Sequence, residues 1–185
     1  DLFLGAGMAA CIIGILQYFD MDPIGFKKLM DPEQYYMFTS TIGNINTYTS
    51  YAALLAGASA LLFFTEEAGI RKAWYLLCMS VSFFALITGM SDNAYLAILA
   101  LVGLLPLYAF KNLRGARTYI FILAVLGSEF WILPRMTKPS SGAAGHMGGL
   151  YRVISGSHYL IVLVAALWAM YFILCRMIQR LPDTH

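Results

Sequence analysis

Six long apolar stretches constrain the fold of this chain more than any other feature of its sequence. Each has roughly the 20 mostly apolar residues that an α-helix needs to cross the hydrocarbon core of a bilayer. They lack the alternation of a membrane β-barrel, and lipid offers backbone groups no hydrogen-bond partners. We therefore expect an all-α fold, a polytopic transmembrane helical bundle with about six spans. The expected helices cover residues 2–19, 47–65, 72–90, 93–110, 116–134 and 158–177.

The composition agrees with a membrane protein. Hydrophobic residues make up 60% of the 185 residues and charged residues 12%, which is about half the charged fraction of a soluble domain. The sequence starts at Asp1 and continues directly into an apolar stretch, without the basic segment that begins a signal peptide. We therefore expect residues 1–185 to form a single transmembrane region, as a fragment of a larger membrane domain.

The basic residues and the cysteines argue against several other classes of protein. The sequence contains no basic run, and no alternation of basic with aromatic residues, that would indicate nucleic-acid binding. Cys11, Cys78 and Cys175 lie far apart in apolar stretches and form no Cys-x-x-Cys pair. Neither a disulfide framework nor a metal site is therefore expected. We expect the cysteines to be small core residues, and we expect no cofactor.

Lysine and arginine residues predict the orientation of the helices in the membrane. Seven of them lie around the short connections after the second and fourth stretches and after the sixth stretch, against five in the longer loops on the other side. The side with the denser positive charge is expected to be cytoplasmic. The two long loops, residues 20–46 and 135–157, are then expected on the outer face of the cytoplasmic membrane.

Three polar clusters are expected to meet on this outward side. In the first, Asn44 and Asn46 precede the second stretch, where they either cap a helix or line a site. In the second, Asp92 and Asn93 lie at the start of the fourth stretch, where a helix cap is again the simpler alternative. Each cluster read by itself is explained by helix capping, so a site is indicated only by the combination of all three.

The third cluster belongs to the long loop between the fifth and sixth stretches. The loop contains Arg135, Lys138, His146 and Arg152, and Glu129 lies inside the stretch before it. An ionisable residue at membrane depth is a functional candidate that needs a partner, so Glu129 either pairs with Arg135 or serves in a site. A loop histidine is often simply solvated. Together, however, the cations suit a phosphate-bearing headgroup, and a carboxylate or imidazole suits a general base.

Three segments within about residues 8–110 have an order and a spacing that resemble a known family. They are Gln17-Tyr18-Phe19, Gly43-Asn44-Ile45-Asn46 and Gly89-Met90-Ser91-Asp92-Asn93-Ala94. In these segments the chain resembles the O-antigen ligase and polymerase superfamily of membrane glycosyltransferases. Three features depart from the family pattern. Asp92-Asn93 stands where the family has an arginine and a glycine, and this chain has fewer apolar stretches than the family has spans. The loop between the fifth and sixth stretches is also much shorter than the large external loop of the family.

The resemblance implies a GT-C-type enzyme of the bacterial cytoplasmic membrane that needs no metal. Such an enzyme transfers a glycan from an undecaprenyl-pyrophosphate carrier to a lipid, glycan or protein acceptor on the outer face. External arginines and a loop histidine are the usual functional residues of the family. In this chain, the positions that match this description loosely are Arg135, Arg152 and His146.

The reaction that we expect from these residues is an inverting glycosyl transfer. Arg135 and Arg152, with Lys138, would hold the pyrophosphate leaving group and stabilise its developing charge. His146 or Asp92 would assist deprotonation of the acceptor hydroxyl. The remaining candidates are Glu129 as a further catalytic carboxylate and, for positioning of the substrate, Asn44, Asn46 and Asn93.

Three other functions remain open on the sequence alone. A transporter or flippase for lipid-linked saccharides would need the same headgroup-binding cations, although no internal repeat is visible. A non-catalytic membrane subunit would explain the missing family arginine. An intramembrane serine protease would use Ser59 and His146, but Ala60 stands where that motif needs a glycine.

Overall fold

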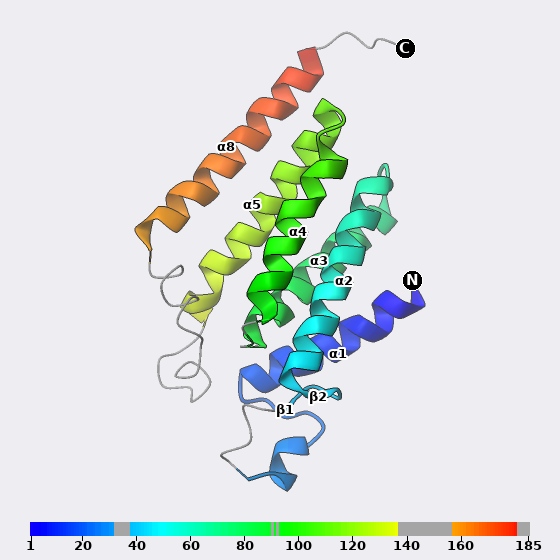
Figure 1. Ribbon diagram of the computed structural model, residues 1–185, viewed down its shortest axis with the longest axis vertical. Coiled ribbons are helices and arrows are strands. Elements are labelled where there is room, and N and C mark those ends of the chain that lie inside the picture. The colour runs from blue at the N-terminus through cyan, green and yellow to red at the C-terminus, as the bar shows by residue number, and fades with distance from the viewer. Residues whose placement is uncertain (32–37, 90, 92, 137–156, 181–185) are drawn as a thin grey trace.

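A computed structural model of the chain shows a bundle of α-helices with a short β-hairpin at one end (Figure 1). The structure describes residues 1–31, 38–89, 91, 93–136 and 157–180. Six α-helices lie in this part of the chain: α1 (Leu2–Tyr18), α2 (Ile45–Thr65), α3 (Ile70–Thr88), α4 (Asn93–Ala109), α5 (Leu113–Met136) and α8 (His158–Arg180). The predicted all-α helical bundle is therefore confirmed.

The connection between α1 and α2 is the one described loop with structure of its own. It contains a 3-10 helical turn, η1 (Phe26–Leu29), and two antiparallel strands, β1 (Phe38–Thr39) and β2 (Gly43–Asn44). The strands pair in the register Phe38 with Asn44 and Thr39 with Gly43. Because β2 runs directly into α2, this hairpin fixes where the second helix begins.

The six apolar stretches coincide with the described helices to within a few residues. The largest difference is at α5, which extends beyond its predicted range at both ends. Arg135 consequently lies on the last turn of α5, and its predicted place in the following loop was wrong. The apolar pattern could not locate this end, because a helix can continue beyond its last apolar residue into the membrane surface.

Four of the described helices, α2, α3, α5 and α8, are long and apolar enough to cross a membrane. Helices α1 and α4 have 17 residues each, or about 26 Å at the usual helical rise, slightly less than the roughly 30 Å of a hydrocarbon core. Helix α1 also runs obliquely to the other helices in Figure 1. The chain is thus a helical membrane protein, with four clear spanning helices among the six predicted.

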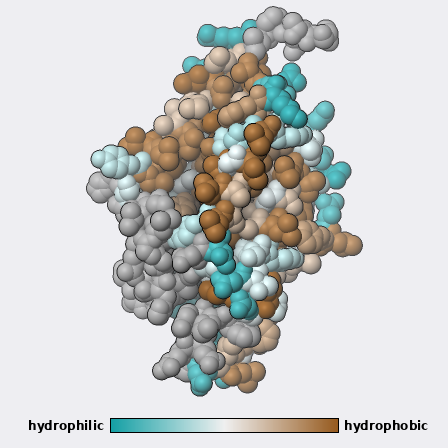
Figure 2. All heavy atoms as spheres, viewed as in Figure 1, coloured by the Kyte–Doolittle hydropathy of each residue, from teal (hydrophilic) through white to brown (hydrophobic). Residues whose placement is uncertain are grey.

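Helices α2 to α5 run alternately up and down, so the bundle has two distinct ends (Figure 1). The hairpin, the end of α3 and the start of α4 lie at the end that we call the hairpin end. The opposite end, which we call the turn end, contains the α2–α3 turn, residues 66–69, and the α4–α5 turn, residues 110–112. Hydrophobic residues cover much of the surface between them (Figure 2), and many on α8 are exposed, as expected of a lipid-facing helix.

The start of α2 is inserted between α1 and the end of α3. The Tyr48 ring is fully buried, and its hydroxyl donates a hydrogen bond to the backbone carbonyl oxygen of Cys11 at 3.2 Å. A Cβ atom at Gly14 of α1 would overlap this ring, and one at Gly89 would overlap the side chain of Thr49. The two glycines therefore allow the close approach that positions the first turn of α2.

The close approach at Gly14 predicts a specific loss of stability. We expect Gly14→Ala to lower the free energy of unfolding by about 1–3 kcal/mol, as overpacking of a filled core usually does. Gly5 lies on the same helix with no atom within 4 Å of where its Cβ would stand, so Gly5→Ala is a matched control without this loss. Thermal unfolding in detergent measures both variants, and equal stability of the two would contradict the insertion of Tyr48 against Gly14.

Candidate functional site

The candidate functional site is the hairpin end, which joins three segments that are far apart in the sequence. These are the end of α1, the hairpin with the start of α2, and the junction between α3 and α4 (Figure 1). Each segment holds one of the three motifs described above. The hydrogen bonds that connect the segments show which polar residues support the fold and which remain exposed.

Gln17 on the last turn of α1 fixes the hairpin to that helix. Its side-chain oxygen Oε1 accepts a hydrogen bond of 2.6 Å from the backbone N–H of Ser40, and both residues are buried. The Ser40 hydroxyl in turn donates a hydrogen bond of 2.6 Å to the carbonyl oxygen of Ala10. The polar side chain at the end of an otherwise apolar helix thus satisfies a buried backbone donor that lipid would leave unpaired.

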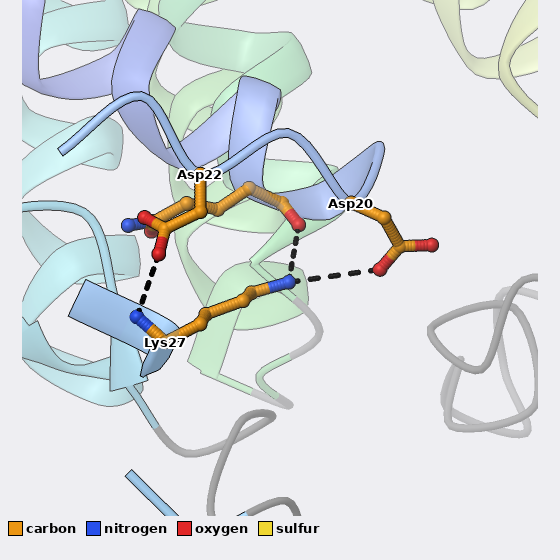
Figure 3. Close-up of polar contacts among 4 residues, drawn as sticks. Asp20, Asp22 and Lys27 are labelled. Atoms are coloured by element: carbon orange, nitrogen blue, oxygen red, sulfur yellow. Dashed lines mark hydrogen bonds and ion pairs between the residues drawn. The ribbon is translucent and has the colours of Figure 1, made fainter. Parts of the chain in front are cut away.

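The segment after α1 folds back onto the helix through Lys27 (Figure 3). The Lys27 ammonium donates a hydrogen bond of 2.8 Å to the carbonyl oxygen of Gln17 and lies 3.6 Å from a carboxylate oxygen of Asp20. The backbone N–H of Lys27 donates to Oδ2 of Asp22 at 2.7 Å. The segment after α1 therefore binds the backbone of Gln17, and the hairpin binds the side chain of Gln17.

Asn44 is the N-cap of α2. Its side-chain oxygen accepts hydrogen bonds from the backbone N–H groups of Asn46 at 2.9 Å and Thr47 at 3.2 Å. These are two of the donors that the first turn of a helix cannot satisfy internally. Capping, one of the two roles that the sequence left open for Asn44, is thus present in the structure, and α2 begins earlier than predicted because of it.

Ser91 connects the start of α2 to the start of α4. Its hydroxyl donates a hydrogen bond of 2.7 Å to the side-chain oxygen of Asn46 and accepts one of 3.3 Å from the backbone N–H of Asn93. Ser91 is buried, whereas Asn46 and Asn93 are exposed. Ser91 therefore brings Asn46 and Asn93, which belong to two different predicted clusters, close to each other.

Glu129 and Arg135 lie on α5 but have separate environments. The Oε2 atom of Glu129 is buried and has no hydrogen-bond partner among the described residues. The guanidinium of Arg135 lies over the ring of Trp131, with Cζ 3.7 Å from the ring centre, and donates a hydrogen bond of 2.5 Å to the Trp131 carbonyl oxygen. No ion pair joins the two residues in the described part of the chain, because a separation of six residues places them on different faces of a helix.

The other four predicted site residues, Asp92, Lys138, His146 and Arg152, lie outside the described residues. The helices before and after the last three of these residues, α5 and α8, are described. In Figure 1 the end of α5 and the start of α8 are the lower ends of these two helices, and the hairpin likewise lies at the lower end of α2. No group of three histidine, cysteine, aspartate or glutamate side chains suited to a metal ion occurs among the described residues.

The sequence analysis missed the structural importance of Gln17, Ser40 and Lys27. Lys27 is one of the five basic residues counted above in the longer loops, and the structure shows that it binds the end of α1. One signal was available: a glutamine in the last turn of an apolar helix needs a partner, and a polar loop follows it directly. The identity of that partner depends on how the loop folds back, which no periodicity in the sequence encodes.

The chain was compared with protein families, curated proteins and solved structures. No protein-family model, curated protein or solved structure matches the chain. The function therefore has to be argued from the residues and their geometry.

The capping role of Asn44 leads to a testable prediction. We expect Asn44→Ala to lower the free energy of unfolding by about 1 kcal/mol, because two backbone donors of α2 lose their acceptor. Asn44→Asp keeps a side-chain acceptor and adds a charge that suits a helix N-terminus, so it should retain the stability of the wild type. Thermal unfolding of the three proteins is the measurement. If Asn44→Ala is as stable as Asn44→Asp, the cap contributes nothing.

Proposed function

We propose that this chain is the membrane region of a bacterial glycosyltransferase similar to the O-antigen ligases and polymerases. It would transfer a glycan from an undecaprenyl-pyrophosphate carrier to a lipid, glycan or protein acceptor. One observation carries the proposal. The three segments on which the resemblance rests are joined at one end of the bundle, by the hydrogen bonds of Gln17 with Ser40 and of Ser91 with Asn46. A common site built from these segments requires such an arrangement.

The distribution of basic residues supports an outward orientation of this site. The turn end carries the basic residues of the short connections, and positive charge in short loops is typical of the cytoplasmic side. The hairpin end would then lie at the outer face of the cytoplasmic membrane. A lipid-linked glycan would reach it within the outer leaflet.

Arg135 is the described residue best placed to hold a pyrophosphate. It is exposed on the last turn of α5, and stacking on Trp131 holds the plane of its guanidinium. A planar guanidinium binds phosphate oxygens through paired hydrogen bonds, which a lysine cannot do. In the proposed reaction, Arg152 and Lys138 complete this clamp and stabilise the negative charge that develops on the leaving pyrophosphate.

The acceptor hydroxyl loses its proton to a base at the same end of the bundle. His146 and Asp92 are the proposed bases, since an imidazole or a carboxylate within hydrogen-bonding distance of the hydroxyl can accept the proton. Glu129 is a further candidate, with a buried carboxylate oxygen that lacks a described partner. The exposed amides of Asn46 and Asn93 would contact the glycan, because amides offer both donors and acceptors to sugar hydroxyls.

A transporter or flippase for lipid-linked saccharides is the second candidate function. The observation that favours it is the same unpaired oxygen of Glu129, because acidic residues at membrane depth often mark ion and substrate pathways. A serine protease gains no support. Ser59 is fully buried in the middle of α2, so its hydroxyl has no access to a peptide.

Glycosyl transfer in detergent tests the proposal, since a flippase produces no signal where there are no compartments. The full-length protein would be given an undecaprenyl-pyrophosphate-linked glycan and candidate acceptors. We expect the wild type to transfer, and Arg135→Ala and Arg152→Ala each to be slower by about 100-fold or more, as is typical for loss of a group that stabilises developing charge.

The control is Arg180→Ala, which removes an exposed arginine at the turn end and should transfer like the wild type. Full transfer by both Arg135→Ala and Arg152→Ala would contradict the clamp. If the wild type binds the labelled lipid without transferring its glycan, the enzyme proposal fails, and a transporter or a non-catalytic subunit takes its place.

A further inference from the structure

A second polar region lies at the turn end of the bundle, opposite the candidate site. It is a cavity of about 730 Å³. Its lining comes from the end of α2, the α2–α3 turn, the first turn of α3, the end of α4, the α4–α5 turn, the first turns of α5 and one residue of α8. Hydrophilic residues are visible towards this end of the molecule in Figure 2. The charged residues that line the cavity are Glu66, Glu67, Lys72, Lys111, Arg114 and Arg117.

Lys72 is held in this cavity by neutral groups. Its ammonium donates hydrogen bonds to the backbone carbonyl oxygens of Glu66 at 2.6 Å and Glu67 at 3.3 Å. It also lies 4.8 Å from the centre of the Phe63 ring. These contacts fix the position of the ammonium. The carboxylates of Glu66 and Glu67 are near enough to attract it, but neither forms an ion pair with it in the described part of the chain.

The other three cations add positive charge to the same space. Arg117 lies near enough to Lys72 for the two charges to repel each other, and it is partly buried. Lys111 and Arg114 are exposed, and the Lys111 ammonium lies 5.1 Å from the centre of the Tyr108 ring. Within the described part of the chain, none of the four cations forms an ion pair with a carboxylate. The four cations outnumber the two carboxylates that line the cavity, Glu66 and Glu67. The excess of positive charge favours the binding of an anion between the cations.

We propose that this cavity binds a phosphate group, carried either by an anionic phospholipid headgroup or by a soluble phosphate compound. Its volume lies within the range of roughly 300–1,000 Å³ that is usual for small-ligand pockets. The guanidinium groups of Arg114 and Arg117 can bind two phosphate oxygens each, and Lys72 adds a fixed point charge. Phe64, Tyr108 and Ile178 line the cavity as well, which suits the glycerol or acyl portion of a lipid.

The helix ends around the cavity favour an anion for a further reason. Helix α5 begins at Leu113 beside the cavity, and the N-terminus of a helix carries partial positive charge. Asn112 already caps this helix, since its side-chain oxygen accepts a hydrogen bond of 2.6 Å from the backbone N–H of Gly115. The side chains of Arg114 and Arg117 therefore carry the recognition, and the helix end adds a favourable field.

The inference is independent of the proposed glycosyl transfer. The cavity shares no residue with the hairpin end, and the two lie at opposite ends of the bundle. A failure of one proposal therefore leaves the other unaffected, because phosphate binding here is measured without any transfer reaction.

Thermal unfolding in lipid nanodiscs, followed by tryptophan fluorescence, tests the proposal. The wild type would be compared in discs of phosphatidylcholine alone, in discs that also contain phosphatidylglycerol, and in phosphatidylcholine discs with added inorganic phosphate. We expect one of the two phosphate sources to raise the midpoint of unfolding by about 2–4 °C. The double variant Lys72→Gln/Arg117→Gln should lose this rise.

The matched control is Arg176→Gln/Arg180→Gln, which removes two exposed cations at the same end that do not line the cavity. It should keep the full rise. A rise with phosphatidylglycerol alone identifies a lipid headgroup, and a rise with inorganic phosphate identifies a soluble ligand. The proposal is overturned if neither source stabilises the wild type, or if the cavity variant and the control respond alike.

A second measurement covers the case in which the double variant does not fold. Native mass spectrometry would count the phosphatidylglycerol or phosphate molecules retained by the wild type and by the single variant Arg114→Gln, whose side chain is exposed at the cavity. We expect the variant to retain several-fold less of the bound ligand. Equal retention by the two proteins would count against the cavity as the site.

Discussion

Lipid cannot form hydrogen bonds with a backbone amide or carbonyl group, and the rest of this structure depends on that constraint. Within the helices the chain satisfies its own backbone groups. Where the chain leaves a helix at the hairpin end, side chains replace the missing partners. Gln17 accepts a hydrogen bond from the backbone of Ser40, and Asn44 accepts two from the start of α2. The polar residues before α2 therefore supply the partners that backbone groups need at the start of this helix.

The same residues support the exposed polar surface of the hairpin end, where the proposed site lies. Ser91 binds the side-chain oxygen of Asn46 and the backbone N–H of Asn93, so these two exposed residues lie near each other. Tyr48, inserted against Gly14, anchors this end to the core of the bundle. The support and the proposed site are thus parts of one arrangement, in which buried hydrogen bonds determine where exposed polar groups stand.

Lysine side chains at the two ends of the bundle have different partners. At the hairpin end, Lys27 forms an ion pair with Asp20 and donates a hydrogen bond to the carbonyl oxygen of Gln17. At the turn end, Lys72 is held by carbonyl oxygens and a ring and forms no ion pair with a described carboxylate, although Glu66 and Glu67 lie near it. A paired cation mainly supports the fold, whereas an unpaired cation in a cavity favours binding. This difference is why the turn end, which the sequence presented only as a marker of orientation, became a candidate binding site.

The sequence by itself determined the number of described helices, their approximate ranges and the membrane setting, because the length of an apolar stretch follows directly from the thickness of a bilayer. It also indicated that Asn44, Asn46 and Asn93 belong to helix starts at one end. Only the tertiary structure decided that Ser91 joins these segments, that Gln17 holds the hairpin, and that Arg135 stacks on Trp131 instead of pairing with Glu129. The physical reason is that hydropathy depends on each residue and its neighbours in the chain. A hydrogen bond between distant segments depends instead on how the helices pack, and packing is set by contacts such as that of Tyr48 with Gly14.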